Sequence, residues 1–314
     1  MGDRVVVTDP RGRRHVLVLE SGKAFFTHRG SLAHDDLIGQ PEGSVLTSSG
    51  GTTYLAMRPS LSEHVMTMPR GAAVVYPKDA AAIVGLADIY PGARVLEAGA
   101  GSGSLTSFLL RAVGSTGSVL SYERRADFAE TATKNISKFF GGRPAQWTLV
   151  VGDLAEATDL PPVDRVILDM LAPWDCLDAA AAALEPAGVI VAYVATTTQM
   201  ARFVETLRVD GRFTEPQASE TLVRTWHVEG LAVRPDHRMV GHTGFLVVAR
   251  RLADGAALPA KRARPAKGAY GADYDGPASS HPDEPAGSDD AASTERPRRL
   301  GRASAIPKRK GRLP

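Results

Sequence analysis

The 314-residue chain has one cysteine, Cys176, and no long apolar run. A single thiol excludes an intrachain disulfide framework, and no cysteine–histidine grouping has the spacing of a zinc site, so we expect no metal. The apolar run at residues 188–195 is far shorter than the roughly 20 residues that span a bilayer, so we expect no membrane partner. Residues 1–10 are charged and strand-like, unlike a signal peptide. These absences predict a soluble, cytoplasmic protein.

Charge of neither sign dominates, because 37 lysines and arginines face 35 aspartates and glutamates, with a formal net charge of +2. Charge is therefore informative only region by region. With 43% hydrophobic residues, the chain can bury one large core and a smaller one. Changes of pattern divide it into an N-terminal part at residues 1–70, a central part at residues 71–252 and a tail at residues 253–314.

The N-terminal part consists of short runs in which apolar and polar residues alternate, at residues 4–8, 15–20 and 23–27. Glycine and proline turns separate them, a pattern typical of a small all-β, barrel-like domain. Its turns carry basic residues that could follow a phosphate backbone, although a merely solvated rim is the alternative. These residues are Arg11, Arg13, Arg14, Lys23, His28 and Arg29.

In the central part, apolar strands alternate with helices. This alternation predicts a Rossmann-like α/β fold, in which helices cover both faces of a mostly parallel sheet. The expected strands are at residues 94–97, 118–123, 147–153, 163–169, 189–194 and 244–250, with one more inside 213–229. The expected helices are at residues 105–113, 127–139, 177–184 and 199–208.

A glycine loop follows the first central strand, with Gly99, Gly101 and Gly103 spaced G-x-G-x-G and Glu97 two residues before them. Small residues between a strand and a helix let backbone N–H groups approach a ligand at the positive end of the helix. The spacing differs from the G-x-G-x-x-G of dinucleotide sites and favours S-adenosylmethionine over NAD. The other candidate cofactor contacts in this loop are Ser102, Ser104 and Leu105.

Four carboxylates end central strands and should share one edge of the sheet: Glu97, Glu123, Asp153 and Asp169. Glu123 is placed to accept hydrogen bonds from both ribose hydroxyls of the cofactor. Asp153 could accept the N6 hydrogens of its adenine, and Phe128 could cover that ring. Glu97 could orient the glycine loop or pair with the methionine amino group. Each acid alone is ordinary, but four in this order indicate a cofactor site.

Asp169 begins a stretch in which Pro173 and Trp174 follow the acid by four and five residues. Methyltransferases that modify base nitrogens commonly place an acid or amide before a proline and an aromatic residue at this point. The longer spacing here argues against the ordinary exocyclic-amine type. The Asp169 side chain would accept from the amine edge of the base and hold the ring nitrogen toward the methyl group.

The tail, residues 253–314, is rich in alanine, proline, glycine and serine, acidic near residues 283–290, and basic at its end. It cannot bury enough apolar surface to offset the entropy of ordering, so we predict disorder. Its basic end could attract nucleic acid or could simply keep the chain soluble.

Four stretches resemble the bacterial and archaeal tRNA (adenine-58-N1)-methyltransferases, in their actinobacterial form: residues 70–79, 97–106, 168–174 and 241–246. The resemblance covers essentially all of residues 1–252. It implies a homotetramer that binds S-adenosylmethionine and tRNA, with Asp169 as the catalytic acid and Tyr76 near the target base. It also places the cofactor loop at residues 102–105, with Glu123 and Asp153 as further contacts. One departure is Leu171, where many relatives have proline, and it affects local loop geometry.

Three alternatives stay open at this stage. A methyltransferase of the same fold could act on a protein or a small molecule, and a chain with this fold could be a non-catalytic RNA-binding subunit. The intact glycines and Asp169 disfavour the second of these. A nucleotide oxidoreductase is disfavoured by the loop spacing.

Overall fold

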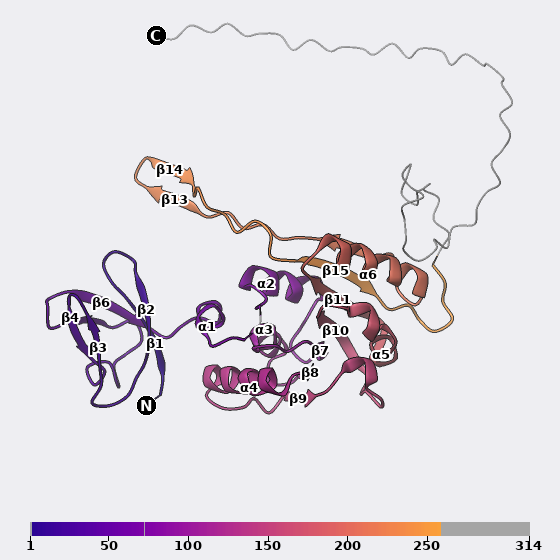
Figure 1. Ribbon diagram of the computed structural model, residues 1–314, viewed down its shortest axis with the longest axis horizontal. Helices are drawn as coiled ribbons and strands as arrows, with labels where there is room; N and C mark the ends of the chain where they lie inside the picture. Colours follow the sequence, from indigo (N-terminus) through magenta and orange to yellow (C-terminus); the bar gives the residue numbers. More distant parts are fainter. Residues whose placement is uncertain (1, 72, 259–314) are drawn as a thin grey trace, which may run out of the picture. The chain divides into compact units, whose positions relative to one another are not determined.

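A computed structural model of the chain describes residues 2–71 and 73–258, and Figure 1 shows the order of its elements. Near the N-terminus, four antiparallel strands form a sheet of order β2-β1-β6-β5, and β3 pairs with β4. Val7, Leu32 and Tyr54 are at most 2% exposed and form the centre of a small core. The strands are β1 (Arg4–Thr8), β2 (Arg14–Val18), β3 (Ala24–Thr27), β4 (Gly30–Ala33), β5 (Val45–Thr47) and β6 (Thr53–Met57). A small β region is therefore confirmed.

The β region is followed by a helix that the sequence analysis did not predict, α1 (Leu61–Thr67). A capping box starts it, because the Ser60 side chain accepts from the Glu63 backbone N–H while the Glu63 side chain accepts from the Ser60 N–H. Arg14 reaches from β2 to the same Glu63 at 2.7 Å. The Ser-x-x-Glu pattern was the available signal for this helix.

The central part contains a seven-stranded sheet of order β12-β15-β11-β10-β7-β8-β9. The strands from β11 to β9 are parallel, whereas β15 is antiparallel to both β11 and β12. The strands are β7 (Arg94–Ala98), β8 (Ser118–Glu123), β9 (Trp147–Val151), β10 (Val163–Asp169), β11 (Leu184–Val194), β12 (Gln217–Ser219) and β15 (Phe245–Arg250). This arrangement confirms the predicted Rossmann-like fold.

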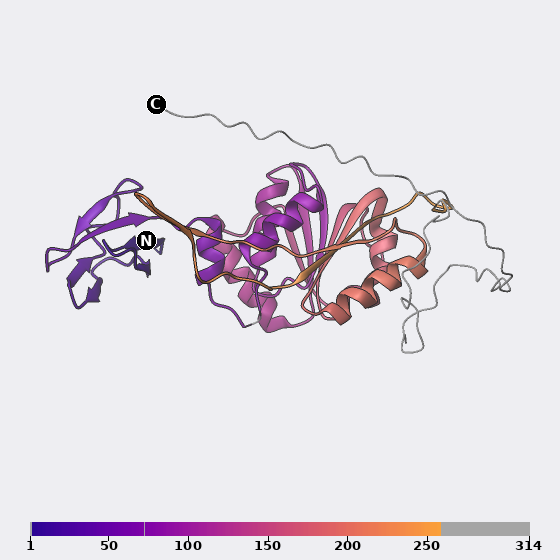
Figure 2. The same cartoon turned by 90° about the horizontal axis from the view of Figure 1, so that it is seen from above.

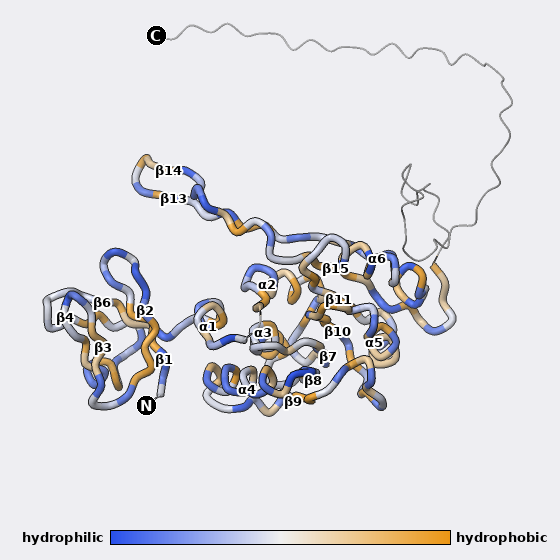
Figure 3. Tube along the Cα trace, viewed as in Figure 1, coloured by the Kyte–Doolittle hydropathy of each residue, from blue (hydrophilic) through white to orange (hydrophobic). Residues whose placement is uncertain are grey.

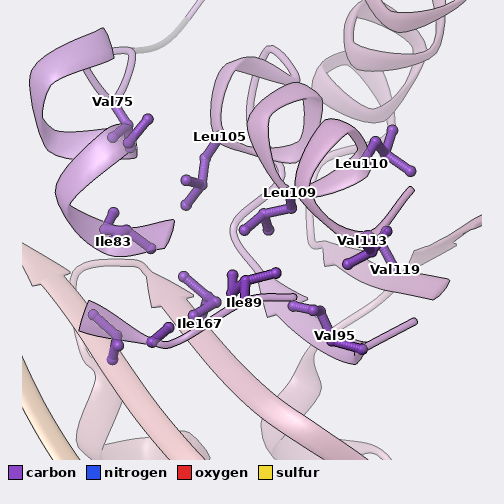
Figure 4. Packing of buried hydrophobic residues seen from close by; sticks show 14 of the residues in the cluster. Val75, Ile83, Ile89, Val95, Leu105, Leu109, Leu110, Val113, Val119 and Ile167 are labelled. Carbon is purple, nitrogen blue, oxygen red and sulfur yellow. The ribbon is translucent and has the colours of Figure 1, made fainter. Parts of the chain in front are cut away.

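Helices cover both faces of this sheet, as Figures 1 and 2 show. Neighbouring residues of β7 illustrate why, because successive strand side chains point to opposite faces. Val95 packs in the cluster that holds Ile83 and Leu109 (Figure 4), whereas Leu96 packs in the cluster with Phe203. Burying each such side chain contributes about 2 kcal/mol. The helices of the first face are α2 (Pro77–Leu86), α3 (Ser104–Val113) and α4 (Ala126–Phe140), and those of the second are α5 (Leu177–Ala183) and α6 (Thr197–Asp210), with short 3₁₀ turns η1 (Leu154–Glu156) and η2 (Pro173–Cys176).

A hairpin of β13 (Trp226–Glu229) and β14 (Ala232–Pro235) extends away from the sheet between β12 and β15 (Figures 1 and 2). We call residues 222–240, which contain it, the arm. The sequence analysis expected one strand within residues 213–229, and the structure has β12 and β13 there. Apolar patches run along the arm in Figure 3, and its exposed large apolar side chains are Leu222, Val223, Trp226, Val228, Leu231, Val233, Met239 and Val240.

Within the described part of the chain, no helix is both long and apolar enough to cross a membrane. The predicted disordered tail is residues 253–314, and its residues 259–314, which include the basic end, lie outside the described residues.

Candidate active site

The glycine loop joins β7 to α3, and its three glycines are required for different reasons. Gly99 has a φ of +89°, and a Cβ there would lie 1.9 Å from the carbonyl oxygen of Asp169. Gly103 has a φ of +82°, and its Cβ would lie 3.0 Å from Ile136. At Gly101, with a φ of +54°, the nearest atom would be 3.9 Å away. Packing therefore demands Gly99 and Gly103, while Gly101 leaves open space beside the loop.

Leu105, in the first turn of α3, is 2% exposed and packs in the sheet core shown in Figure 4. Only its backbone N–H can serve a ligand, because the first N–H groups of a helix have no intrahelical partner. Ser102 and Ser104 are also buried. The Ser104 hydroxyl donates to the Val75 carbonyl at 2.8 Å, whereas the Ser102 hydroxyl has no partner among the described residues.

Glu97 is completely buried at the end of β7. One of its oxygens accepts from the hydroxyls of Thr106 at 2.8 Å and Ser121 at 2.5 Å. The other oxygen, Oε1, has no hydrogen-bond partner in the described part of the chain. Burial raises the pKa of this carboxyl to about 7, and the nearby Glu123 carboxylate adds to the rise. Glu97 thus keeps one oxygen free for a ligand, and among the described residues no backbone N–H of the glycine loop donates to it.

The contact with the glycine loop falls to Glu123, which is buried at the end of β8. Its Oε2 accepts from the Gly101 N–H at 2.8 Å, and its Oε1 accepts from the Arg125 N–H at 2.9 Å. Each carboxylate oxygen keeps a second lone pair for further donors. Glu123 therefore lies at the loop, as its predicted ribose-binding role requires.

Asp153 and Phe128 lie at the ends of neighbouring elements. The Asp153 carboxylate caps η1 by accepting from the Ala155 N–H at 3.0 Å, and it pairs with Arg124 at 3.4 Å. Phe128, half-buried on α4, has the Arg125 guanidinium 3.9 Å from its ring centroid. Its ring also lies against Gly71, where a Cβ would come within 2.8 Å.

Asp169 ends β10, with β7 and β11 on either side. It is half-buried, and none of the described residues donates a hydrogen bond to its carboxylate. Desolvation, with the Glu97 and Glu123 carboxylates nearby, raises its pKa to about 7. The loop beyond it is held by α6, where the Gln199 side chain donates to the Leu171 carbonyl at 2.8 Å. Asp169 is thus an acid whose hydrogen-bonding capacity is kept for a ligand.

Tyr76 is half-buried and directly precedes Pro77, the first residue of α2. Its carbonyl accepts from the N–H groups of Asp79 and Ala80, both at 2.9 Å. The Asp79 carboxylate accepts from the Thr243 hydroxyl, and the Thr243 carbonyl accepts from the hydroxyl of Tyr193, which pairs with Asp169 across β11 and β10. Burial raises the pKa of the Tyr193 phenol. The structure therefore brings Tyr76 to the side of the sheet where Asp169 ends β10.

Asn135, which the sequence analysis did not single out, joins the chain before Tyr76 to the glycine loop. From α4, its side-chain amide donates to the carbonyls of Pro69 at 2.8 Å and Ser102 at 2.9 Å. It is 4% exposed. An asparagine inside a helix has no spacing that predicts such contacts, because both partners are distant in sequence.

The charge of the site fits a cationic ligand. The Glu123 carboxylate lies close enough to raise the pKa of both Glu97 and Asp169, and no lysine or arginine within the described ranges forms an ion pair with these three acids. A sulfonium and an ammonium group would relieve this crowding of like charges. The free Glu97 oxygen and the unpartnered Ser102 hydroxyl supply polar contacts, so the residues present fit S-adenosylmethionine.

Comparison with known proteins gives a consistent result. Residues 1–46 match the TrmI-like N-terminal family, and residues 52–234 match the family described as tRNA methyltransferase complex GCD14 subunit. The chain is 38% identical to the tRNA (adenine(58)-N(1))-methyltransferase TrmI of Thermus thermophilus, across 79% of this chain and 96% of that protein. It is 32% identical to the tRNA (adenine(57)-N(1)/adenine(58)-N(1))-methyltransferase TrmI of Methanocaldococcus jannaschii, across 78% and 94%.

Two solved structures are also similar. The SAM-dependent O-methyltransferase of Thermotoga maritima superposes with a TM-score of 0.76 at 31% identity, covering 80% of this chain and 94% of that one. The tRNA (m1A58) methyltransferase TrmI of Aquifex aeolicus superposes with a TM-score of 0.71 at 26% identity, covering 80% and 98%. With a family match over residues 52–234 and relatives above 30% identity along most of the sequence, this chain belongs to the GCD14/TrmI family of tRNA methyltransferases.

Proposed function

We propose that the chain transfers a methyl group from S-adenosylmethionine to N1 of adenine 58 in the T-loop of tRNA. The observation that carries this proposal is the Asp169 carboxylate, which ends β10 without a donor among the described residues and lies beside the glycine loop through Gly99. The relatives named above as adenine-58 methyltransferases support the choice of base.

The cofactor supplies a methyl group made electrophilic by a positive sulfonium. Glu123 would accept from the ribose hydroxyls with its free lone pairs, and Asp153 would accept from the adenine amino group, whose ring Phe128 would cover. The free Glu97 oxygen would face the methionine ammonium. The backbone N–H groups of the glycine loop and of the first turn of α3 would bind the remaining polar atoms.

The acceptor nitrogen needs positioning more than activation. N1 of adenine already carries a lone pair, so no strong base is required, and the site must align that lone pair with the methyl group. Methylation leaves positive charge spread over N1 and N6. Asp169 at N6 would stabilise that charge, and a carboxylate whose pKa lies near 7 can then accept the N6 proton.

The base must also leave the folded tRNA, because its N1 lies on the Watson–Crick edge. Extrusion costs a few kcal/mol, and contacts to the flipped base offset it. Tyr76 would supply such a contact, since it lies on the Asp169 side of the sheet. The basic turns of the β region, which include Arg11, His28 and Arg29, would follow the phosphate backbone.

A homotetramer in the cytoplasm completes this proposal. Its support in the structure is the arm, on which Trp226 is 58% exposed and Leu231 fully exposed. Exposed apolar surface of this kind marks interaction sites, and a second copy of the chain would cover it. The proposed partners are therefore tRNA and the chain itself.

Methyl transfer to a hydroxyl oxygen is the alternative that a specific observation supports, since the similar Thermotoga maritima structure is described as an O-methyltransferase. Transfer to a hydroxyl requires removal of its proton, and an acid with a pKa near 7 such as Asp169 can act as the base. The two reactions differ in their product, so one assay separates them.

The deciding experiment measures methyl transfer from labelled S-adenosylmethionine to unmodified tRNA. Asp169→Ala should lower the rate by roughly 100- to 1,000-fold, as expected for a lost electrostatic contact. Asp175→Ala, which removes an exposed acid from the following turn, is the matched control and should keep the rate. Label must appear as N1-methyladenosine and must vanish with a tRNA that lacks adenine 58. Cofactor binding without transfer to any tRNA would reject the proposal.

A further inference from the structure

A buried polar cluster joins the start of α2 to the chain just before β15. The Lys78 ammonium donates to the Asp79 carboxylate at 2.7 Å and to the Thr243 hydroxyl at 2.6 Å. The same hydroxyl donates to the other Asp79 oxygen at 2.5 Å. The side chains of Lys78 and Asp79 are 10% and 1% exposed. The three form a closed triangle between segments 164 residues apart in the sequence.

The triangle forms hydrogen bonds at both ends of the arm. The third donor position of Lys78 goes to the Thr221 carbonyl at 2.7 Å, so that the ammonium has no donor left over. Thr221 directly precedes the arm, and Thr243 follows it closely. Lys78 therefore ties together the points where the chain enters and leaves the arm.

The triangle also contacts the reaction side of the sheet. The Thr243 carbonyl accepts from the Tyr193 hydroxyl at 2.8 Å, and Gly244 lies so close to the Tyr193 ring that a Cβ would come within 2.4 Å. Tyr193 pairs with Asp169 across β11 and β10. On its other side, the Asp79 N–H donates to the Tyr76 carbonyl.

We propose that Lys78, Asp79 and Thr243 are positioning residues. They fix where Tyr76 and Tyr193 lie relative to Asp169, and the position of the arm determines this placement. This role rests on the proposed function, because Tyr76 and Asp169 face the target base only if adenine is the substrate. A buried ion pair is a poor way to gain stability, since desolvation offsets most of its attraction, but it admits very few arrangements. When a second copy of the chain covers the arm, the arm would be held in one position, and the triangle at its ends would then hold the two tyrosines in one arrangement.

Thr243→Val tests the proposal, because it keeps the shape of the side chain and removes the hydroxyl that both charges share. Its kcat on tRNA should fall by about 10- to 100-fold, the effect of slight misplacement in a reaction centre. Its affinity for S-adenosylmethionine should stay within about twofold, because the triangle does not contact the glycine loop. Thr243→Ser, the matched control, keeps the hydroxyl and should retain kcat.

Hydrogen exchange supplies a readout independent of the reaction. The amide of Asp79 and the amides at the two ends of the arm, at residues 221–225 and 241–244, should exchange faster together in Thr243→Val and not in Thr243→Ser. If wild-type protein methylates no tRNA adenine, the proposed function fails, whereas the coupling is still decided by this exchange. Unchanged kcat in Thr243→Val, equal losses in the valine and serine variants, or faster exchange on one side only would overturn the inference.

A second variant covers the case in which Thr243→Val does not fold. Lys78→Met combined with Asp79→Leu removes both charges at once, so no unpaired charge stays buried and the fold is retained. Its kcat should fall as in Thr243→Val, with the cofactor affinity kept. Full kcat in this folded variant would also overturn the inference.

Discussion

At the scale of single residues, the site is defined by carboxylates that lie closer together than isolated acids would tolerate. Glu97 and Asp169 both have a pKa raised to about 7, first by desolvation and then by neighbouring carboxylates. The sequence predicted which acids end the strands, but the rise of the pKa of Glu97 and of Asp169 depends first on burial, which only the folded structure sets. A cationic ligand would relieve this crowding of negative charge, and the raised pKa gives Asp169 a proton affinity suited to its proposed role.

The raised pKa of Asp169 predicts a pH dependence of the reaction. The carboxylate form is the active one, so kcat/KM should rise with pH through about 7 and fall about tenfold for each unit below it. Asp169→Asn cannot ionise and should show a slow rate without this rise. Initial rates between pH 5.5 and 8.5 provide the check. A wild-type profile that stays flat across pH 7 would contradict the assignment.

At the scale of elements, the β7–loop–α3 unit shows that one glycine pattern serves two purposes. Gly99 and Gly103 are needed because Asp169 and Ile136 lie against them, whereas a side chain at Gly101 would meet open space. The spacing alone predicts the same role for all three glycines. Only the contacts show which of them pack against neighbouring residues and which one has open space beside it.

Alanine substitutions should separate these purposes. Gly99→Ala should lower the melting temperature steeply, because its Cβ would overlap the Asp169 carbonyl. Gly101→Ala should fold at a cost of about 1–2 kcal/mol from its positive φ, and should lose affinity for S-adenosylmethionine. Thermal unfolding and cofactor titration measure the two effects.

The control for this pair is Gly141→Ala at the end of α4, where φ is +75° and no atom lies within 4 Å of the added Cβ. It should cost similar backbone strain and leave cofactor affinity unchanged. Equal melting temperatures for Gly99→Ala and Gly101→Ala would show that the contact with Asp169 does not decide how far an alanine at position 99 destabilises the fold.

At the scale of the whole molecule, the arm is a part whose apolar side chains are not buried in a core of the same chain. Four of its exposed apolar residues, Trp226, Val228, Leu231 and Val233, lie on a two-stranded hairpin, in which each strand has one pairing partner. An isolated hairpin of this kind is marginally stable in water, so covering it by another copy would stabilise it. The proposed homotetramer would therefore fix the position of the arm, and the triangle at the base of the arm would connect that position to the site.

Replacing apolar arm residues should reduce the size of the assembly. The triple variant Trp226→Ser, Leu231→Ser and Val233→Ser removes exposed apolar surface without touching the sheet core. Light scattering should report a smaller particle than wild type. Val45→Ser, which changes an equally exposed valine on β5, should leave the mass unchanged. A tetramer that persists in the triple variant would place the interface elsewhere.

Much of the site could be predicted because its signals are local. Apolar runs that end in an acid predict the edge of a parallel sheet, and the parallel strands of a Rossmann-like fold must bring those ends together. Asp169, Glu123 and the glycine loop were found in this way. The signal for helix α1 is equally local, since Ser60 and Glu63 form its capping box, but the helix has only seven residues and follows directly on the β region.

The chain alone therefore determined the fold, the position of the glycine loop and the acids at the sheet edge, because side-chain period and strand ends are properties of neighbouring residues. Packing decided the rest. Lys78 and Thr243 become partners across 165 residues, and Asn135 reaches two carbonyls that no spacing relates. Contacts of this kind exist only after the elements have docked, since a hydrogen bond between distant residues depends on angles and separations that the whole core sets.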